Sequence, residues 1–348
     1  MTNLTININS HPAAYPIVIN QGLLAELNKH VNKHTYSSIF VVTDKNILKL
    51  YGKQVSKQVN AQHIIAIEPG ENDKSLATVR YIWQQLNLLN ADRKSLVVNL
   101  GGGVVSDIGG FAASTYMRGL DFINIPTTLL SAADASIGGK TGFNFEGIKN
   151  LVGSFAQPKA VLIDVDTFKT LDDRTFNEGL AEIIKHAAVF DESYFKQLHD
   201  VLPKPNQKQL TEILYKSCQI KADTVSKDEK EAGQRKLLNF GHTIGHAVES
   251  LSYEAKAAEP LLHGEAVSIG MVAEAKLGEK SGFTEAGTSD KLKLLLEKVN
   301  LPTAIPSWAK DSQIEQKVLK DKKNQSQKLL WVMLRKIGEA SADISLPG

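Results

Sequence analysis

Short runs of consecutive apolar residues alternate with a helical pattern in the first half of the chain. Apolar runs that end in polar or turn-forming residues predict buried strands at 38–44, 63–67, 95–100, 122–126 and 160–164. Between the second and third of these runs, apolar residues recur at helical spacing over 75–89, which predicts an amphipathic helix. Uninterrupted apolar strands separated by helices are typical of a parallel sheet covered on both faces. We therefore predict an α/β domain in this half.

Beyond about residue 174 the pattern changes to long helical periodicities. Helices are predicted over about 174–189, 207–228, 235–251, 260–281 and 288–298. A strand signal returns only at 328–334. We place the domain boundary after the last strand of the first half, so that residues 1–172 form an α/β domain and residues 173–348 form a helical one.

Composition excludes several classes of protein. The 348 residues contain 40 Lys and Arg against 38 Asp and Glu, so a nucleic-acid binder with a wholly basic surface is excluded. Cys218 is the only cysteine, so a metal would have to be held by His and carboxylate side chains. The chain has neither a signal-peptide pattern at its start nor an uncharged apolar run of ~18 residues. We expect a cytoplasmic enzyme.

A glycine-rich segment at 101–107 follows a predicted strand and opens a predicted helix. Its sequence, GGGVVSD, nearly fits the G-x-G-x-x-G pattern of dinucleotide-binding turns, with Ser106 in the last place. Glycines there let the backbone approach a phosphate, and the helix N-terminus favours negative charge. A tight strand-to-helix turn without a ligand would look similar. Asp44, at the end of an earlier strand, could accept hydrogen bonds from ribose hydroxyls or could simply cap the next helix.

A second glycine-rich segment, DASIGGKTG at 134–142, carries Lys140. Gly-Gly-Lys-Thr resembles the end of a P-loop, but Asp134 stands where that motif requires its leading glycine, so a Walker A motif is excluded. A glycine-rich, lysine-bearing loop suits a phosphorylated or carboxylated ligand, and Lys149 and Asn150 lie just downstream. Each of these lysines, considered singly, could also be an ordinary surface charge.

Histidines and one glutamate suggest a metal site in the helical half. His242 and His246 are four residues apart and share one helix face, and His263 opens another predicted helix. Glu182 and Lys185 are three residues apart on an earlier helix. Without a cysteine pair, a Glu/His/His site with open positions is the natural catalytic zinc arrangement. The alternatives are histidines without a metal and an exposed Glu182–Lys185 ion pair.

Isolated basic residues add weaker signals. Arg235 lies four residues before Asn239 and could enter the histidine-bearing site to bind a phosphate, although charge runs such as 228–235 are usually solvated. Lys221 and Arg118 have the same two interpretations.

Together these segments resemble the 3-dehydroquinate synthase family of the shikimate pathway. The matching blocks, in family order over about residues 40–338, are GGGVVSD at 101–107, FAASTYMRG at 111–119, PTTLL at 126–130, DASIGGKTGFN at 134–144, KNLVGSF at 149–155, EGLAEIIK at 178–185, RKLLNFGHTIGHAVE at 235–249, HGEAV at 263–267 and DKK at 321–323. The resemblance implies a Rossmann-like, NAD-binding α/β domain at 1–172. It also implies an all-α domain at 173–348 that binds metal and substrate.

The resemblance also implies residue roles by position. The metal ligands, for Zn²⁺ or Co²⁺, would be Glu182, His242 and His263. NAD would contact Asp44, Glu71, Lys74, Gly103, Val104, Val105, Ser106, Asp107, Thr127, Thr128, Lys140 and Lys149. The catalytic residues would be Lys140, Lys185, Lys221, Arg235, Asn239 and His246. Further substrate contacts would come from Asp134, Lys149, Asn150 and, across a homodimer, Arg118. One lysine of the pair Lys322 and Lys323 would also contact the substrate, with Lys323 favoured. Ser106 and Ala187 stand where the family usually has glycine.

The activity implied is conversion of 3-deoxy-D-arabino-heptulosonate 7-phosphate to 3-dehydroquinate and phosphate. It proceeds by transient NAD oxidation, phosphate elimination, re-reduction and internal aldol closure. The partners implied are this sugar phosphate and a second copy of the chain, with no nucleic acid or membrane. The alternatives are another sugar phosphate cyclase, a metal-dependent polyol dehydrogenase of related fold, and a non-enzymatic binding protein. The set of lysine, asparagine, arginine and histidine residues disfavours another cyclase. The GGKTGFN and NFGHTIGH blocks disfavour a polyol dehydrogenase. The intact Glu and His ligand candidates disfavour a non-enzymatic binding protein.

Overall fold

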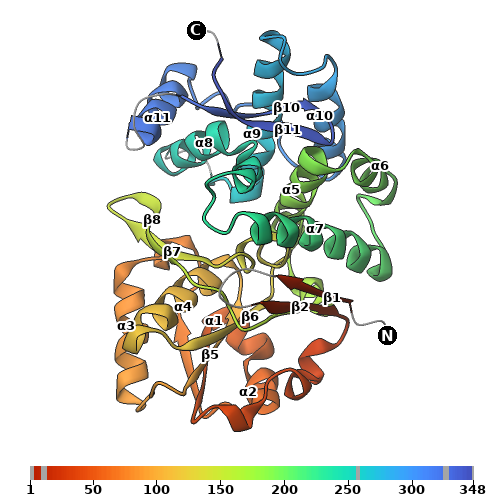
Figure 1. The fold of residues 1–348 in the computed structure, drawn as a ribbon. Coiled ribbons are helices and arrows are strands. Elements are labelled where there is room, and N and C mark those ends of the chain that lie inside the picture. The colour runs from red at the N-terminus through yellow and green to blue at the C-terminus, as the bar shows by residue number, and fades with distance from the viewer. Residues whose placement is uncertain (1–3, 9–13, 256–258, 324–328, 347–348) are drawn as a thin grey trace. The chain divides into compact units, whose positions relative to one another are not determined.

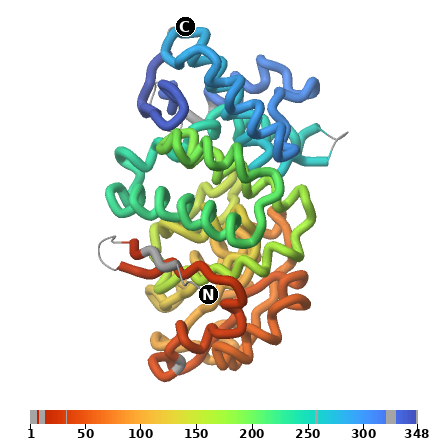
Figure 2. The backbone as a smooth tube through the Cα atoms, turned by 90° about the vertical axis from the view of Figure 1, so that its right-hand side faces the viewer, coloured from red at the N-terminus to blue at the C-terminus, as the bar shows by residue number. Residues whose placement is uncertain are grey.

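The computed structural model describes residues 4–8, 14–255, 259–323 and 329–346, and it divides the chain into two compact units. The first unit is Met1–Leu171 together with Lys221–Ser226, and the second is Asp172–Ile220 with Lys227–Gly348. Figures 1 and 2 colour most of the first unit from red to yellow and most of the second from green to blue. Each unit is described by itself below.

A seven-stranded sheet forms the first unit, in the order β1-β2-β9-β6-β5-β3-β4 (Figure 1). The only antiparallel pair in this order is β1 with β2, and the other neighbours are parallel. The strands are β1 (Leu4–Ile8), β2 (Tyr15–Asn20), β3 (Ile39–Asp44), β4 (His63–Ile67), β5 (Leu96–Gly101), β6 (Asp121–Pro126) and β9 (Val161–Asp164). The five predicted strands correspond to β3, β4, β5, β6 and β9; β1 and β2 were not predicted.

Helices cover both faces of this sheet because its strands are apolar on both sides. Phe40 of β3 belongs to the same buried cluster as Ile82 of α3 and Ile108 of α4. The next residue, Val41, points to the other face and joins a cluster with Val55 of α2. The helices are α1 (Lys45–Ile47), continued through a π-helical turn (Leu48–Gly52) into α2 (Lys53–Val59), then α3 (Leu76–Leu88) and α4 (Gly103–Thr115). The predicted α/β architecture is therefore confirmed.

A hairpin replaces the loop predicted around Lys140. β7 (Lys140–Phe145) pairs antiparallel with β8 (Ile148–Phe155), and Phe145 opposes Ile148. The two residues between them, Glu146 and Gly147, both have positive φ angles of 49° and 74°. Positive φ at both positions is the geometry of a type I′ turn, the two-residue turn that best matches strand twist. The glycine content of this segment led to the prediction of a loop where the structure has two strands.

The second unit is mainly helical. Its helices are α5 (Asp173–Phe190), α6 (Glu192–Val201), the parts of α7 (Gln207–Lys227) outside 221–226, α8 (His242–Glu254), α9 (His263–Lys280), α10 (Thr288–Lys298) and α11 (Asp311–Lys323). The strand signal at 328–334 corresponds to β10 (Trp331–Lys336), which pairs with β11 (Glu339–Ile344), so this unit also contains a small hairpin. The helix predicted over 235–251 begins only at His242, because a 3-10 turn (Gln234–Asn239) precedes it and Gly241 has a φ of 81°.

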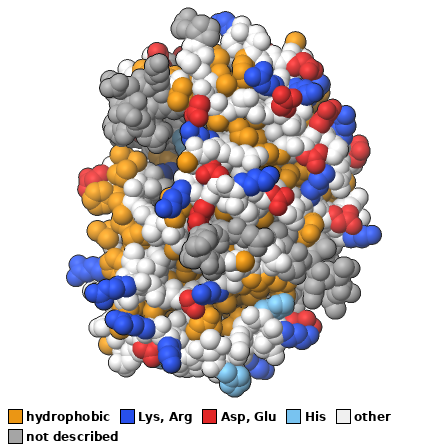
Figure 3. Space-filling view, in the orientation of Figure 1, with side chains coloured by type: hydrophobic (Ala, Val, Ile, Leu, Met, Phe, Trp, Pro, Cys, Tyr) orange, Lys and Arg blue, Asp and Glu red, His pale blue; other side chains and the backbone are white. Residues whose placement is uncertain are grey.

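The charged side chains on the face drawn in Figure 3 do not indicate a particular class of binding partner. On the face drawn in Figure 3, basic and acidic side chains are interspersed, in keeping with the net charge of +2. In the part of the chain that the structure describes, no helix combines the length and apolarity needed to cross a membrane.

Candidate active site

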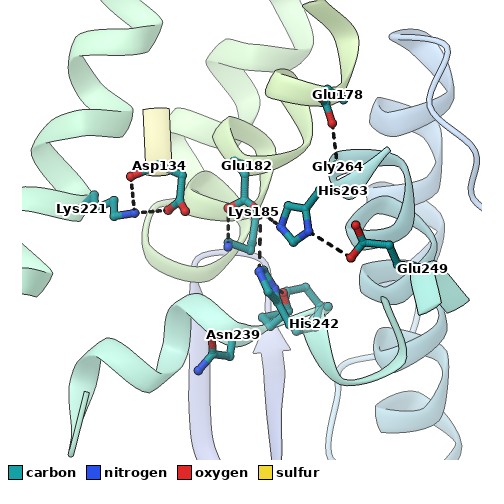
Figure 4. A network of polar contacts seen from close by, with 12 residues as sticks. Asp134, Glu178, Glu182, Lys185, Lys221, Asn239, His242, Glu249, His263 and Gly264 are labelled. Carbon is teal, nitrogen blue, oxygen red and sulfur yellow. Dashed lines mark hydrogen bonds and ion pairs between the residues drawn. The ribbon is translucent and has the colours of Figure 1, made fainter. Parts of the chain in front are cut away.

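In the second unit, Glu182 and Lys185 lie in the middle of α5 and are both buried. Lys185 is 1% exposed and Glu182 is fully buried, and the Lys185 ammonium contacts the Glu182 carboxylate as an ion pair (Figure 4). The alternative of an exposed ion pair is therefore wrong. Burying two charges is costly unless further partners compensate them, which points to a use beyond stability.

His242 and His263 face Glu182 from two other helices. The Nε2 atom of each imidazole lies 3.8 Å from Glu182 Oε1. His242 is the first residue of α8 and His263 the first of α9, so each side chain projects from a helix start (Figure 4). His246, one turn further along α8, has its ring centre 5.0 Å from that of His242 and 5.7 Å from that of His263.

Glycines and a buried carboxylate bring α8 and α9 together. A Cβ atom at Gly270 of α9 would lie 1.9 Å from the carbonyl oxygen of Gly241, so only glycine permits this approach. Glu274 of α9 is fully buried and accepts hydrogen bonds from the amides of Gly241, at 2.7 Å, and Ile244, at 2.9 Å. Both amides lie at the N-terminus of α8 and would otherwise lack helical partners. The start of α8, where His242 lies, is thus held against α9.

The other nitrogen of each imidazole has its own partner. His242 Nδ1 lies 3.2 Å from the carbonyl oxygen of Phe240, and His263 Nδ1 lies 3.4 Å from Glu249 Oε2. Burial lowers the pKa of His242 well below its usual value, and the neighbouring Lys185 adds to this. Burial would also lower the pKa of His263, but the Glu249 carboxylate outweighs it and raises that pKa.

These residues fit a divalent metal ion. Glu182 Oε1 is buried and has no hydrogen-bond donor among the described residues, whereas Oε2 pairs with the Lys185 ammonium. Two ligand atoms of a tetrahedral zinc, each about 2.1 Å from the ion, lie roughly 3.4 Å apart, close to the 3.8 Å between Glu182 Oε1 and each imidazole. His242, His246 and His263 can also bring ligand nitrogens within 4.8 Å of one another, so His246 offers a third imidazole.

Two predicted substrate residues of this unit lie on one 3-10 turn, Gln234–Asn239, directly before α8. Arg235 is only 2% exposed and donates from Nη1 to the carbonyl oxygen of Glu229. Asn239 donates from Nδ2 to Glu231 Oε1. Arg235 is therefore not part of a solvated charge run.

In the first unit, the predicted NAD residues follow the carboxyl ends of neighbouring strands. β3 lies between β4 and β5, so the strand order reverses beside β3. In open parallel sheets, ligands bind beyond the carboxyl ends at such a reversal. The residues at these ends are Asp44 after β3, Glu71 and Lys74 after β4, Gly103, Val104, Val105, Ser106 and Asp107 after β5, and Thr127 and Thr128 after β6.

Asp44 and Lys74 each have a hydrogen-bond partner within the first unit. Asp44 Oδ1 accepts from the amides of Asn46 and Ile47 at 2.8 and 3.0 Å, so the helix-cap interpretation holds for that oxygen. Lys74 is buried and donates to Asp107 Oδ2 at 2.6 Å. Burial would lower the pKa of Lys74, but Asp107 and Glu71 outweigh it and raise that pKa.

Ser106, where the resemblance implies a glycine, lies within the first turn of α4. Its side chain is buried, and its hydroxyl lies 3.3 Å from the hydroxyl of Ser131. The backbone amides of the first turn of α4, which begins at Gly103, remain the groups that suit a phosphate.

The remaining predicted residues of the first unit lie on α7 and between residues 134 and 150. Lys221 of α7 donates to the carbonyl oxygen of Asp134 at 2.6 Å and also contacts its carboxylate (Figure 4). Lys149 Nζ lies 4.0 Å from Glu71 Oε1. Asn150, with a φ of 52°, donates from its amide to Asn144 Oδ1 at 2.9 Å. Lys140 is exposed at the start of β7.

Arg118 lies away from the predicted NAD turn. Arg118 is exposed beyond the C-terminus of α4, about 20 Å along that helix from Gly103. The side chain of Lys323 lies outside the described residues, as does that of Lys322.

Glu249 and Glu274 were missed by the sequence reasoning. A signal for Glu249 was available: it lies three residues after His246 and seven after His242, on the same face of α8. Glu274 had no such local signal, because it acts on the start of a different helix.

Comparisons with known proteins agree with this architecture. Family models described as 3-dehydroquinate synthase N-terminal and C-terminal match residues 64–178 and 179–324. The 3-dehydroquinate synthase of Clostridium beijerinckii is 40% identical over 98% of this chain and 97% of its own. That of Enterococcus faecalis is 40% identical over 99% of this chain and 96% of its own.

Solved structures share the fold. A 2-epi-5-epi-valiolone synthase from Streptomyces hygroscopicus, with NAD⁺ and Zn²⁺ bound, superimposes with a TM-score of 0.84 at 28% identity, covering 95% of this chain and 92% of its own. A 2-deoxy-scyllo-inosose synthase complexed with carbaglucose-6-phosphate, NAD⁺ and Co²⁺ gives a TM-score of 0.88 at 24% identity, covering 97% and 94%. The predicted fold class is confirmed.

Proposed function

Because the chain belongs to the 3-dehydroquinate synthase family, we propose that it converts 3-deoxy-D-arabino-heptulosonate 7-phosphate to 3-dehydroquinate and phosphate, using NAD and a divalent metal ion. The observation that carries this is the 40% identity to a 3-dehydroquinate synthase over nearly the whole chain. The buried Glu182 between two imidazoles supports it independently, because these side chains suit a divalent metal ion. Such an ion would help the substrate hydroxyl group at which the reaction begins to lose its proton.

The second unit holds the metal and its surroundings. Glu182, His242 and His263 are the ligands, and Zn²⁺ or Co²⁺ suits a carboxylate and two imidazoles. When bound, such an ion acidifies a substrate hydroxyl and polarises the neighbouring carbonyl group. Lys185, which pairs with Glu182, donates a hydrogen bond to a substrate oxygen. His246 accepts the proton of the substrate hydroxyl at an imidazole nitrogen.

The first unit holds NAD. When NAD is bound, the amides of the 103–107 turn would hold its pyrophosphate, because a helix N-terminus favours negative charge. Asp44 would accept hydrogen bonds from the ribose hydroxyls through Oδ2, because Oδ1 caps the following helix. The hydrogen bond from Lys74 to Asp107 would hold both side chains in place beside the cofactor. Glu71, Thr127, Thr128, Lys140 and Lys149 complete the contacts.

Basic and amide groups hold the substrate's two anionic ends. Arginine and lysine bind phosphate and carboxylate through charge-assisted hydrogen bonds, and burial strengthens these bonds. The residues assigned to this task are Lys140, Lys149, Asn150, Lys221, Arg235, Asn239 and Lys323. Asp134, the remaining predicted substrate residue, accepts a hydrogen bond from Lys221. The enzyme works in the cytoplasm as a homodimer, and its exposed Arg118 reaches the phosphate of the neighbouring copy.

Phosphate release from the heptulosonate phosphate tests the function. We expect release that requires both metal and NAD, with no lasting rise in absorbance at 340 nm, because the hydride returns to the substrate. Chelation by EDTA should abolish release, and added Zn²⁺ or Co²⁺ should restore it. The product must be identified as 3-dehydroquinate, since a phosphatase also liberates phosphate.

Other outcomes would contradict the proposal in distinct ways. Steady accumulation of NADH would indicate a simple polyol dehydrogenase. No release by metal- and NAD-replete protein, together with turnover of a different sugar phosphate, would indicate another cyclase of this fold.

A further inference from the structure

Glu249 is a buried carboxylate that the proposed reaction does not use. It lies on α8, is 2% exposed, and places Oε2 3.4 Å from Nδ1 of His263 (Figure 4). His263 comes from a different helix, α9, so the contact joins the two helices that carry the imidazoles. Burying a carboxylate is costly, and this one faces an imidazole rather than solvent.

The two nitrogens of His263 point at different carboxylates. Nδ1 faces Glu249, whereas Nε2 faces Glu182 Oε1 at 3.8 Å. A neutral imidazole carries one N–H group and one lone pair. With the proton on Nδ1, donated to Glu249, the lone pair of Nε2 is directed toward the metal position.

His242 shows the same division of roles. Its Nδ1 faces the backbone carbonyl of Phe240 at 3.2 Å, and its Nε2 faces Glu182 Oε1 at 3.8 Å. Both imidazoles are therefore oriented through Nδ1, one by a carbonyl group that no substitution removes and one by a side chain that can be replaced.

We propose that Glu249 is a positioning residue that fixes the tautomer and the ring orientation of His263, and thereby sets the affinity of the site for its metal ion. This inference rests on the proposed role of His263 as a ligand. Carboxylate partners of ligating histidines raise ligand basicity, and their loss costs 10–100-fold in metal affinity in other proteins (order of magnitude).

The test measures the dissociation constant of Zn²⁺ by competition with a chromogenic chelator. Glu249→Ala removes the acceptor and should weaken Zn²⁺ binding roughly 10–100-fold. Glu249→Gln keeps a carbonyl oxygen that can still accept from Nδ1, so it should fall between the parent protein and Glu249→Ala. The intermediate value separates positioning from a packing defect.

Glu279→Gln is the matched control. Glu279 lies on α9 and accepts from the amide and hydroxyl of Ser289, both at 2.8 Å. It is a hydrogen-bonded glutamate of the same helix pair that contacts no histidine in the described structure, so this variant should bind Zn²⁺ like the parent. Thermal melting of each metal-free protein shows whether the variants remain folded.

A double variant distinguishes failure of this inference from failure of the metal site. Because Glu249 acts through His263, adding Glu249→Ala to His263→Ala should change the Zn²⁺ affinity no further. If His263→Ala weakens Zn²⁺ binding but folded Glu249→Ala and Glu249→Gln bind it like the parent, the positioning role is wrong. If His263→Ala itself leaves Zn²⁺ binding unchanged, the ligand assignment is wrong and the role of Glu249 fails with it.

Discussion

At the scale of single residues, hydrogen-bond and ion-pair partners decide whether a charged side chain stabilises the fold. Asp191 illustrates this outside the candidate site. It caps α6, accepting from the Tyr194 amide at 2.9 Å and the Ser193 hydroxyl at 2.6 Å, and it pairs with Lys216 at 2.9 Å. Burial alone would raise the pKa of Asp191, but these three partners lower it to about 2.

This lowered pKa predicts an acid-dependent contribution to stability. Since the folded-state pKa lies below the ordinary value of 3.8, the contribution is fully present above that value and is lost as the pH falls toward about 2. Asp191→Asn keeps a capping oxygen but removes the charge, so it should lower the free energy of unfolding at pH 7 by ~1 kcal/mol. Denaturant titrations should show this gap closing between pH 4 and pH 2.

Glu212→Gln, in an exposed pair with Lys208 at 3.8 Å, is the surface control and should stay within about 0.5 kcal/mol of the parent at pH 7. A gap between Asp191→Asn and the parent that persisted unchanged at pH 2 would show that the charge of Asp191 contributes nothing.

At the scale of elements, the contact between α8 and α9 decides whether the imidazoles can meet. Gly270 of α9 lies against the backbone at the start of α8. Glu274, one turn after Gly270 on α9, accepts hydrogen bonds from two amides at the start of α8. The same two helices carry His242, His246 and His263. A small change in their separation would therefore alter the site even though it touches no ligand.

Gly270→Ala should separate these helices. The added methyl group would lie 1.9 Å from the Gly241 carbonyl oxygen, a backbone atom that cannot move aside cheaply. Although alanine raises helix propensity by about 1 kcal/mol, we expect a net loss of about 2 kcal/mol in the free energy of unfolding. Zn²⁺ affinity should fall in parallel.

Lys276→Ala, on the exposed side of α9, controls for helix propensity and should lie within about 0.5 kcal/mol of the parent. Unchanged stability and Zn²⁺ affinity in Gly270→Ala would show that α8 and α9 tolerate a wider spacing.

At the scale of the whole molecule, the proposed tasks are divided between two units. The residues proposed to bind NAD belong to the first unit, whereas Arg235, proposed to bind the substrate, belongs to the second. Arg235→Ala should therefore raise the KM for the heptulosonate phosphate roughly 10–100-fold by removing charge-assisted hydrogen bonds, while NAD affinity stays unchanged. Steady-state kinetics and NAD titration measure the two separately.

The neighbouring Lys236→Ala is the matched control, because Lys236 pairs with Asp343 at 2.9 Å on the surface. An unchanged KM in Arg235→Ala would remove Arg235 from the substrate site, and an equal loss of NAD affinity would contradict the division of tasks.

Local patterns determined a large part of this structure. The strands β3, β4, β5, β6 and β9 could be predicted because each is a short run of mostly apolar residues, and such runs are typical of parallel strands. The helices α5, α7, α9 and α10 were readable from their periodicity to within a few residues. The hairpin β7–β8 was not, since its glycines and lysine gave a loop-like composition.

The sequence by itself therefore determined the α/β and helical halves. Residue types and spacing suggested a Glu/His/His metal site, and the resemblance to the family implied that Glu182, His242 and His263 are its ligands. Only the tertiary structure decided that Glu182 is buried between two imidazoles, that Lys185 is not a surface charge, and that Ser106 turns toward Ser131. It also decided that Glu249 and Glu274 support the site. The physical reason is range: hydrophobic periodicity acts within one element, whereas these contacts join residues of different elements through close helix packing.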